Sequence, residues 1–322
     1  MEIDKPLVSI LMAVYKPNSI WFREQLESLN NQTYSNLELV IYNDCPQDKL
    51  DESMIREIVK KFPYRIINGE KNLGSNKAFE ILTQFGEGKY FSYCDQDDVW
   101  HKDKIQKMAD VLEKTNSPMV CSDLAVIDGD DNKIANSITD VRKRHVFYDG
   151  EDVTSHLLVR NFVTGCAMMM KSDVAKKSIP FVDSLVHDHW LAINASLYGK
   201  IEIIRESLID YRQHSNNQTG VLKGVKTKTD YYNARIENMR LRIEDYKTRL
   251  IGFNNVDKTI VELETFNNAR SRYFYSHKRQ DRKIMNQYKY FAPQDIMLEK
   301  IMPFLPNFIM KMIFGIIRKG WI

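Results

Sequence analysis

Three carboxylates stand within four positions of the sequence, at Asp95, Asp97 and Asp98. They follow the apolar run 90–94, at the point where a strand must end. Like charges this close repel one another, and burial would remove their solvation, so a divalent cation is the simplest partner. Oxygen ligands favour Mg²⁺ or Mn²⁺, which would take phosphates as further ligands. The segment predicts a metal–diphosphate site, with a solvated Asp-rich turn as the alternative.

The elements before and after these acids alternate between apolar runs and amphipathic segments. The predicted strands are 7–14, 37–42, 64–67, 89–94 and 119–121, and the predicted helices are 20–30, 51–62, 74–83 and 103–112. This alternation predicts an α/β fold with a mostly parallel sheet covered on both faces. Ligands of such sheets lie beyond the carboxyl ends of the strands. Tyr15, Asp44 and the acids at 95–98 all follow strand ends, so we expect them to converge on one crevice.

The pattern changes after Asp123. A hairpin turn is predicted at 128–131, and short strands at 201–204 and 208–211. From about residue 223 the composition shifts to long, charged and aromatic helices. We therefore expect a first domain over 1–222 and a helical C-terminal domain over 223–322.

Composition indicates a soluble globular protein rather than a nucleic-acid-binding one. Of the 322 residues, 43% are hydrophobic and 28% charged, and the net charge is only +3. The four cysteines each lie in or beside an apolar run and none form a C-x-x-C pair, which favours buried thiols in a reducing compartment. The N-terminus does not resemble a signal peptide, and no apolar stretch reaches the roughly 18 residues of a membrane span. These features predict a cytoplasmic protein.

Six segments, in this order, resemble the family 2 glycosyltransferases of GT-A fold. Four of them are 8–15, 40–44, 72–77 and 94–100. The His-Asp-His-Trp segment at 187–190 and the Tyr-Arg-Gln-His-Ser-Asn segment at 211–216 narrow the similarity to bacterial rhamnosyltransferases and related enzymes of cell-surface polysaccharide synthesis. The resemblance covers roughly residues 6–220. It implies a GT-A domain followed by an α-helical extension.

On the donor side, the resemblance implies a nucleotide-sugar site. Asp44 would accept a hydrogen bond from N3–H of uracil or thymine, although a turn-forming Asn-Asp pair is the alternative. Lys77 would face phosphate, unless its segment is a plain helix N-terminus. The other residues assigned to the nucleotide sugar are Tyr15, Asn72, Gly74, Asp95 and Arg212, the last as a phosphate contact.

The resemblance also assigns a metal, Mn²⁺ or Mg²⁺. Asp97 would coordinate the ion directly, and Asp95 would contact either the ion or the donor ribose. His214 would reach back to the metal or the diphosphate, and Asp98 would hold a metal-bound water. The cation would offset the charge of the departing nucleoside diphosphate.

Asp188 matches the family's general base. An acceptor hydroxyl has a very high pKa, so its proton must leave as it attacks the anomeric carbon. One such base with an assisted leaving group gives a single displacement with inversion. The alternative is a first-turn Asp that stabilises a helix. Gly165 would leave room for the acceptor sugar, and Trp190 would stack on it unless it belongs to the core.

The segment 301–322 is strongly apolar and carries Lys311, Arg318, Lys319 and Trp321. It predicts a helix of about 14 residues lying on the inner, anionic face of the cell membrane. Docking onto the protein's own helical domain or onto a dimer partner is the alternative, and a stripe at 236–250 also permits a homodimer.

Together these features predict an inverting, metal-dependent hexosyltransferase. It would move a hexose, L-rhamnose from dTDP-L-rhamnose, onto a glycan or lipid-linked acceptor in cell-surface polysaccharide synthesis. The alternatives are a transferase that uses UDP-glucose or UDP-galactose, a sugar nucleotidyltransferase, and a non-enzymatic membrane scaffold. No nucleic acid partner is expected.

Overall fold

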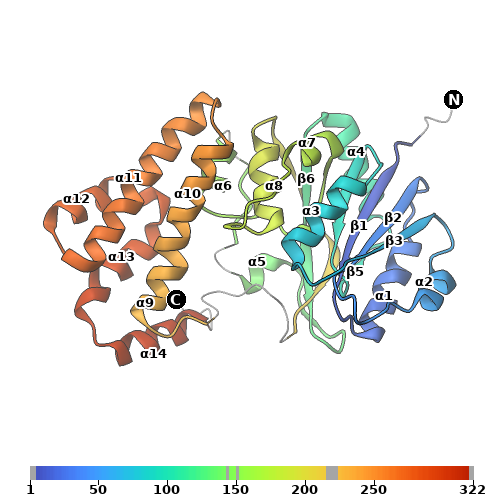
Figure 1. Ribbon diagram of the computed structural model, residues 1–322, viewed down its shortest axis with the longest axis horizontal. Coiled ribbons are helices and arrows are strands. Elements are labelled where there is room, and N and C mark those ends of the chain that lie inside the picture. Colours follow the sequence, from blue (N-terminus) through green and yellow to red (C-terminus); the bar gives the residue numbers. More distant parts are fainter. Residues whose placement is uncertain (1–4, 143–144, 150–151, 215–223, 319–322) are drawn as a thin grey trace. The chain divides into compact units, whose positions relative to one another are not determined.

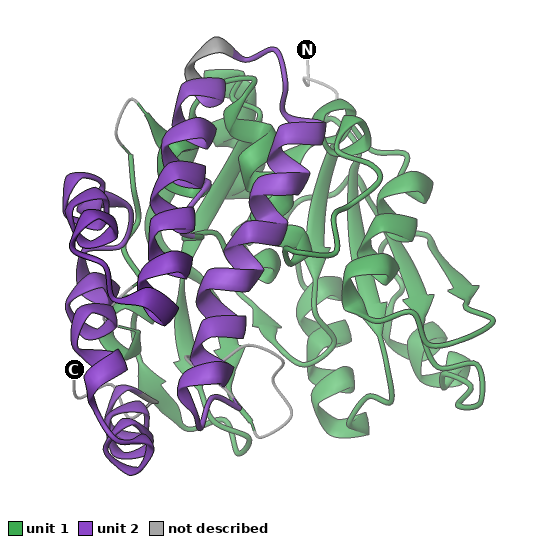
Figure 2. Ribbon diagram, turned by 60° about the vertical axis from the view of Figure 1, so that its left-hand side comes forward, with its two compact units in different colours: residues 1–157, 161–215 green, residues 158–160, 216–322 purple. Residues whose placement is uncertain are grey.

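The computed structural model describes residues 5–142, 145–149, 152–214 and 224–318 (Figure 1). The chain divides into two units, one of residues 1–157 and 161–215 and the other of residues 158–160 and 216–322 (Figure 2). The predicted domain boundary between 222 and 223 lies outside the described residues. Each unit is described by itself below.

The core of the first unit is a nine-stranded sheet, with the spatial order β3-β2-β1-β4-β8-β6-β9-β5 and β7 paired to β6. Its strands are β1 Val8–Val14, β2 Leu37–Asn43, β3 Tyr64–Asn68, β4 Tyr90–Cys94, β5 Val99–Trp100, β6 Met119–Ile127, β7 Lys133–Ala135, β8 Met168–Lys171 and β9 Ile201–Arg212. Branched and aromatic apolar residues dominate these segments, as expected for strands buried on both faces.

The first half of the sheet is parallel and the second half is mixed. β1 pairs in parallel with β2 and β4, and β2 with β3, so their carboxyl ends meet at one edge. β8 is antiparallel to both β4 and β6, while β9 runs parallel to β6. The predicted α/β class is therefore confirmed, with a more mixed sheet than expected. The two short strands predicted at 201–204 and 208–211 are one strand, β9, with irregular register against β6.

Eight α-helices and one short 3-10 helix are described in the first unit. They are α1 Ser19–Asn30, α2 Glu52–Ile58, α3 Ser75–Phe85, α4 Lys104–Thr115, α5 Ile138–Val141, α6 Val153–Leu157, the 3-10 helix η1 Gly165–Ala167, α7 Ser172–Lys177 and α8 His187–Ser196. Helices α3, α7 and α8 pack against one another, so α3 lies beside the helix that carries Asp188.

The second unit is helical, as the sequence predicts. Its elements are α9 Lys228–Tyr232, the π-helical turn η2 Asn233–Glu237, α10 Asn238–Arg249, α11 Asn254–Ser276, α12 Arg279–Gln287, the 3-10 helix η3 Lys289–Phe291, α13 Pro293–Ile301, the 3-10 helix η4 Met302–Phe304 and α14 Asn307–Arg318.

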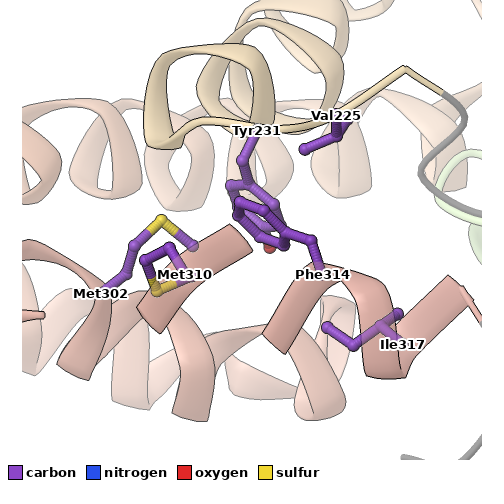
Figure 3. Close-up of a cluster of buried hydrophobic side chains, with 6 residues drawn as sticks. All are labelled: Val225, Tyr231, Met302, Met310, Phe314 and Ile317. Atoms are coloured by element: carbon purple, nitrogen blue, oxygen red, sulfur yellow. The ribbon is translucent and has the colours of Figure 1, made fainter. Parts of the chain in front are cut away.

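The apolar tail is divided between an inner and an outer face. Met310, Phe314 and Ile317 of α14 pack in a buried cluster with Val225, Tyr231 and Met302 (Figure 3). The rings of Tyr231 and Phe314 stack with centroids 5.6 Å apart. This face docks within the tail's own helical unit, which was the alternative to membrane contact. None of the described helices is long and apolar enough to cross a membrane.

Candidate active site

The acid loop, residues 95–98, connects β4 to β5, and its three carboxylates lie in different environments. Asp98 is completely buried. Its Oδ1 accepts the backbone N–H of Arg212 at 3.0 Å. Its Oδ2 has no N–H or O–H partner among the described residues, and the thiol of Cys166 lies beside the carboxyl group. Burial, and then the charges of Asp97 and Asp95, raise the pKa of Asp98 well above its ordinary value.

Asp97 and His214, predicted to share a role, lie together. His214 Nε2 is 2.8 Å from Asp97 Oδ2, although 117 positions separate the two residues in the sequence. The imidazole ring packs at a tilt against Trp21, with centroids 4.8 Å apart. Both side chains of the pair keep some solvent exposure. The pair can therefore receive an ion or a ligand from outside.

Asp95 is partly exposed and lies near the predicted base. Burial, followed by the charges of Asp97 and Asp188, raises the pKa of Asp95 to about 7. Asp95, predicted to bind the donor or the metal, and Asp188, predicted to be the base, are thus close enough for their charges to interact. Burial and mutual repulsion disfavour the ionised form of these carboxylates, so a divalent cation would stabilise the cluster.

The acid loop contains donors that a hard cation would accept. Among the described residues, the group of three donors at ligand spacing is Asp95, Asp98 and Cys166, whose ligand atoms lie within 4.8 Å of one another, rather than the predicted Asp95, Asp97 and His214. Burial raises the pKa of the Cys166 thiol, so it stays protonated and is a weak ligand. The two carboxylates remain, and their oxygens are donors that Mn²⁺ or Mg²⁺ accepts; His214 lies outside this group.

Asp188 stands in the first turn of α8 and is held by two donors. Asn161 Nδ2 donates to its Oδ1 at 2.9 Å, and the backbone N–H of Gly165 donates to its Oδ2 at 3.1 Å. Burial raises the pKa of Asp188 to about 6, against the opposing effect of these hydrogen bonds. A carboxylate whose pKa approaches neutrality is suited to remove a proton.

Two residues predicted to bind the acceptor have other roles. A Cβ at Gly165 would lie 2.6 Å from His187 Nε2, so the missing side chain makes room for His187 rather than for a sugar. Trp190 is only 1% exposed, and its Nε1 donates to Ser178 O at 2.8 Å. It is a core residue, which corrects the predicted stacking role, since a sugar ring cannot reach a buried indole.

Asp44, Asn72 and Gly74 lie together and are joined by hydrogen bonds to the loop before α3. Asp44 Oδ1 accepts the N–H of Leu73 at 2.7 Å, and its Oδ2 accepts that of Gly74 at 2.8 Å. Asn72 Oδ1 also accepts the N–H of Gly74. Gly74 precedes α3 with φ of 81°, a conformation that favours glycine. Each carboxylate oxygen can accept a second hydrogen bond, so Asp44 keeps the capacity to bind a pyrimidine N3–H.

Helix α3 also holds the segment that leads to Asp188. Asn76 Nδ2 donates to Val182 O and Leu185 O, both at 3.1 Å. Glu80 Oε2 accepts the N–H of Phe181 at 2.7 Å, and its other oxygen pairs with Lys77. The predicted phosphate residue Lys77 is therefore engaged by Glu80. Sequence reasoning missed Asn76 and Glu80; the one available signal is an acid, Glu80, on the apolar face of a helix.

Arg212 is placed differently from the prediction. It is 0% exposed, and its guanidinium donates to Glu24 at 2.7 Å and to Asp131 at 2.6 Å. Its Nε donates to the backbone oxygen of Asp97 at 2.8 Å. A guanidinium enclosed by carboxylates does not face a diphosphate. Arg212 instead ties the acid loop to α1 and to the turn after β6, which corrects its predicted phosphate contact.

Lys104, at the start of α4, is a residue that sequence reasoning missed. It is 0% exposed. Its Nζ lies 3.0 Å from the ring centroid of Trp100 and 3.4 Å from Ser92 Oγ. Burial lowers the pKa of Lys104 to about 7, while nearby thiols and acids, including Asp98, oppose the change. The signal in the sequence is its position directly before the apolar stripe of α4, which places it on the buried face.

Comparison with known proteins agrees with this architecture. The chain is 28% identical over 236 residues to an uncharacterized glycosyltransferase of Methanocaldococcus jannaschii, covering 71% of this chain and 78% of the relative. It is also 28% identical over 236 residues to an uncharacterized glycosyltransferase of Haemophilus influenzae, covering 70% and 71% respectively.

Solved structures match over nearly the whole chain. S. aureus TarS 1–349 in complex with UDP-GlcNAc is similar with a TM-score of 0.59 and 14% identity, covering 97% of this chain and 90% of that one. The likeness confirms the predicted GT-A fold. The Glycosyl transferase family 2 pattern matches residues 9–176, more than half of the 322 residues. The chain therefore belongs to glycosyl transferase family 2.

Proposed function

We propose that the protein is an inverting glycosyltransferase that takes its sugar from a nucleoside diphosphate and transfers it to a glycan or lipid-linked acceptor. The observation that carries the proposal is the approach of Asp188 to the acid loop: Asp188 accepts the N–H of Gly165, and the Sγ of the next residue, Cys166, lies within 4.8 Å of carboxylate oxygens of Asp95 and Asp98. In the proposal, the base Asp188 and the diphosphate site at the acid loop therefore lie on either side of the reacting sugar. The UDP and UDP-GlcNAc complexes of TarS support a nucleotide-sugar donor.

In this proposal each residue has a defined task. Asp188 accepts the proton of the acceptor hydroxyl as its oxygen attacks the anomeric carbon, and Asn161 and the N–H of Gly165 hold the carboxylate in place. Asp97, together with Asp95 and His214, would hold Mn²⁺ or Mg²⁺. When bound, the cation supplies Lewis-acid stabilisation of the leaving diphosphate.

The donor is proposed to be dTDP-L-rhamnose, as the rhamnosyltransferase-like motifs suggest, with cell-surface polysaccharide synthesis as the setting. Asp44 would pair with N3–H of either thymine or uracil, so the base-binding residue does not discriminate between them. A UDP-hexose, with glucose or galactose, is the second candidate, and the TarS complexes with UDP and UDP-GlcNAc support its uridine diphosphate part.

A donor screen tests the proposal. Purified protein is offered dTDP- and UDP-sugars with Mn²⁺ and an acceptor, and release of the nucleoside diphosphate is measured. Asp97→Ala and Asp188→Asn should abolish transfer, whereas the exposed control Asp110→Asn should not. The anomeric configuration of the product, read by NMR, reports inversion. If folded Asp188→Asn transfers at the wild-type rate, the assignment of the base is wrong.

We also propose that the helical domain, 223–322, brings the enzyme to the inner face of the cell membrane. The outer face of α14 supports this, because Phe308 and Met312 are 68% and 66% exposed. The segment 300–322 has four Lys or Arg residues and no Asp or Glu, which suits anionic lipid. Co-sedimentation with phosphatidylglycerol vesicles should be lost in the Phe308→Ser/Met312→Ser variant. Equal binding to purely zwitterionic vesicles, or binding only of a second copy of the chain, would contradict the proposal.

A further inference from the structure

His187 is a buried histidine beside the proposed base, and it has no part in the transfer step described above. Its ring stacks on that of Phe79 in α3, with centroids 4.0 Å apart, and is tilted against that of Tyr93 in β4, with centroids 5.8 Å apart. Its Nε2 has no hydrogen-bond partner among the residues that the structure describes. Burial lowers the pKa of His187 to about 3, so the imidazole is neutral near neutral pH. The ring therefore acts through its shape and contacts rather than through charge.

The tip of this ring faces Gly165. A Cβ at Gly165 would lie 2.6 Å from His187 Nε2 and 3.1 Å from its Cε1, and the first of these distances is too short for any real Cβ. The φ of Gly165 is not in the left-handed region, so its backbone conformation would accept an alanine. The absence of a side chain at position 165 is therefore a requirement of space, which the ring of His187 sets.

The contact between His187 and Gly165 lies directly beside the carboxylate of Asp188. Gly165 donates its N–H to Asp188 Oδ2 at 3.1 Å, and Asp188 follows His187 in the first turn of α8. A Cβ at Gly165 would also contact Asp188 Cβ, at 3.6 Å. Gly165 thus meets the carboxylate through its N–H, and it meets the imidazole on the side where a Cβ would stand. A shift of the ring tip or of Gly165 would therefore change the hydrogen bond to the carboxylate.

Phe79 and Tyr93 fix the orientation of the ring. Phe79 belongs to α3, the helix whose Asn76 holds the 182–185 segment before Asp188. Tyr93 lies in β4, two residues before the acid loop begins, and its hydroxyl is 2.8 Å from Thr83 Oγ1. A ring packed between two other rings in a dense core has little freedom to turn. The imidazole therefore holds Gly165 at a position that the sheet and α3 determine.

We propose that His187 is a positioning residue for Asp188. Its neutral ring, held by Phe79 and Tyr93, is a spacer that sets the place of Gly165. Through the N–H of Gly165 it sets the orientation of the carboxylate and supports the ionised form. Gly165 and His187 are therefore a matched pair, in which the size of one side chain limits the size of the other. The effect on the carboxylate rests on these contacts, whereas the effect on sugar transfer also rests on the proposed function of Asp188 as the base.

An exchange of size between the two positions tests the spacer. Gly165→Ala adds a methyl group that collides with the ring tip, and His187→Leu removes the ring atoms that face Gly165 while it keeps an apolar side chain. Each change alone should lower kcat about tenfold and leave the donor KM within about twofold, because the base is misplaced and the donor site is not. The double variant should recover to within about threefold of wild type, since the new methyl group fills the space of the missing ring atoms.

The control for an added methyl group is Gly315→Ala in α14, where a Cβ would meet nothing within 4 Å. It should transfer at the wild-type rate. Gly165→Ala should also move the acidic limb of kcat/KM to higher pH, because the N–H of Gly165 favours the ionised form of Asp188 and the charges of Arg142 and Asp95 stay the same. Losses that multiply in the double variant, or a Gly165→Ala protein with the kcat and the acidic limb of wild type, would overturn the spacer.

The amide of Gly165 reports the same contact by NMR without any substrate. In protein labelled with ¹⁵N-glycine, its resonance is the one that Gly165→Ala lacks, and it should shift with a midpoint near pH 6 in wild type and not in Asp188→Asn. In His187→Leu the midpoint should rise by about half a pH unit, as expected when one hydrogen bond to a charged group weakens. An unchanged titration in His187→Leu would overturn the proposal. A raised midpoint together with a wild-type kcat would support the positioning role, and the base of the proposed function would then be wrong.

Discussion

The side chain of Gln96 bonds to both backbone groups of Tyr15. Its Oε1 accepts the N–H of Tyr15 at 2.7 Å, and its Nε2 donates to the backbone oxygen of the same residue at 3.2 Å. The side-chain amide of Gln96 thus pairs with the Tyr15 backbone as a peptide group of a neighbouring strand would, and it links the end of β1 to the acid loop. The pairing of β1 with β4 ends at Met12 and Cys94, and Gln96 connects the two chain segments beyond that point, where the donor is expected to bind.

Replacement of Gln96 by Leu should loosen the acid loop. Two hydrogen bonds at about 1 kcal/mol each are lost, so unfolding should become easier by roughly 1–2 kcal/mol. The KM for the donor should rise by about threefold to tenfold, because part of the binding energy now orders the loop. Urea unfolding and steady-state kinetics measure the two effects. Gln84→Leu, an exposed position on α3, is the control, and equal effects in both variants would contradict the role of Gln96.

Arg212 should be a stability residue rather than a donor-binding one. Arg212→Met removes the charge-assisted hydrogen bonds to Glu24 and Asp131, which are 30% and 55% exposed, so the loss should be about 2–3 kcal/mol. Arg212→Lys should recover only part of the loss, because an ammonium cannot contact several acceptors in the planar arrangement of a guanidinium. Urea unfolding measures both. An Arg212→Met variant as stable as wild type but with a raised donor KM would instead support the predicted phosphate contact of Arg212.

The parts of the site that could be predicted are those that local pattern determines. Parallel strands end at one edge, so the convergence of Tyr15, Asp44 and the acid loop follows from reading strands alone. The contact between Asp97 and His214 depended on the family resemblance, because 117 positions separate them and no periodicity relates them.

The errors arose where packing decides the role. Nothing local shows that Glu24 and Asp131 surround Arg212, or that His187 fills the space above Gly165. Such contacts join residues far apart in the sequence and have no signature in one sequence. Lys104 was overlooked for a different reason: a lysine on a helix is ordinarily solvated, although its place at the start of the buried stripe of α4 was a local signal.

Asn76 should affect chemistry more than donor binding. Asn76→Ala removes both hydrogen bonds to the 182–185 segment that precedes Asp188, so the base is held less precisely. A kcat reduced by about tenfold with an unchanged donor KM is expected, as for a loss of about 1.4 kcal/mol in the transition state. Gln84→Ala, at an exposed position of the same helix, is the control. Lys77→Met tests a separate point, because Lys77 is half exposed while its partner Glu80 is only 4% exposed. If Lys77→Met instead raises the donor KM, its predicted phosphate role is supported.

The pH profile of transfer should report Asp188. Its pKa is raised by burial to about 6, and the base must be ionised, so kcat/KM should fall about tenfold per pH unit below that value. The N–H groups of His189 and Gly165, the amide of Asn161 and the charge of Arg142 all favour the ionised form. Asn161→Ala should therefore move the acidic limb to higher pH. A limb that stays in place, or moves to lower pH, would contradict this assignment.

Ionisation of Asp188 should lower the stability of the folded protein, although it is needed for activity. Its folded-state pKa of about 6 exceeds its ordinary value of 3.8, so the folded protein binds more protons between these two pH values. The contribution of Asp188 to stability therefore falls as pH rises through this window, and the cost persists above it. Asp188→Asn should be more stable than wild type at pH 8, by on the order of 1 kcal/mol after allowance for partial exposure and the lost hydrogen bond from Asn161. The difference in the free energy of unfolding between the two proteins should shrink as pH falls to about 4. Urea unfolding at several pH values measures it. A difference that does not change with pH would show that Asp188 is not unfavourably ionised in the folded protein.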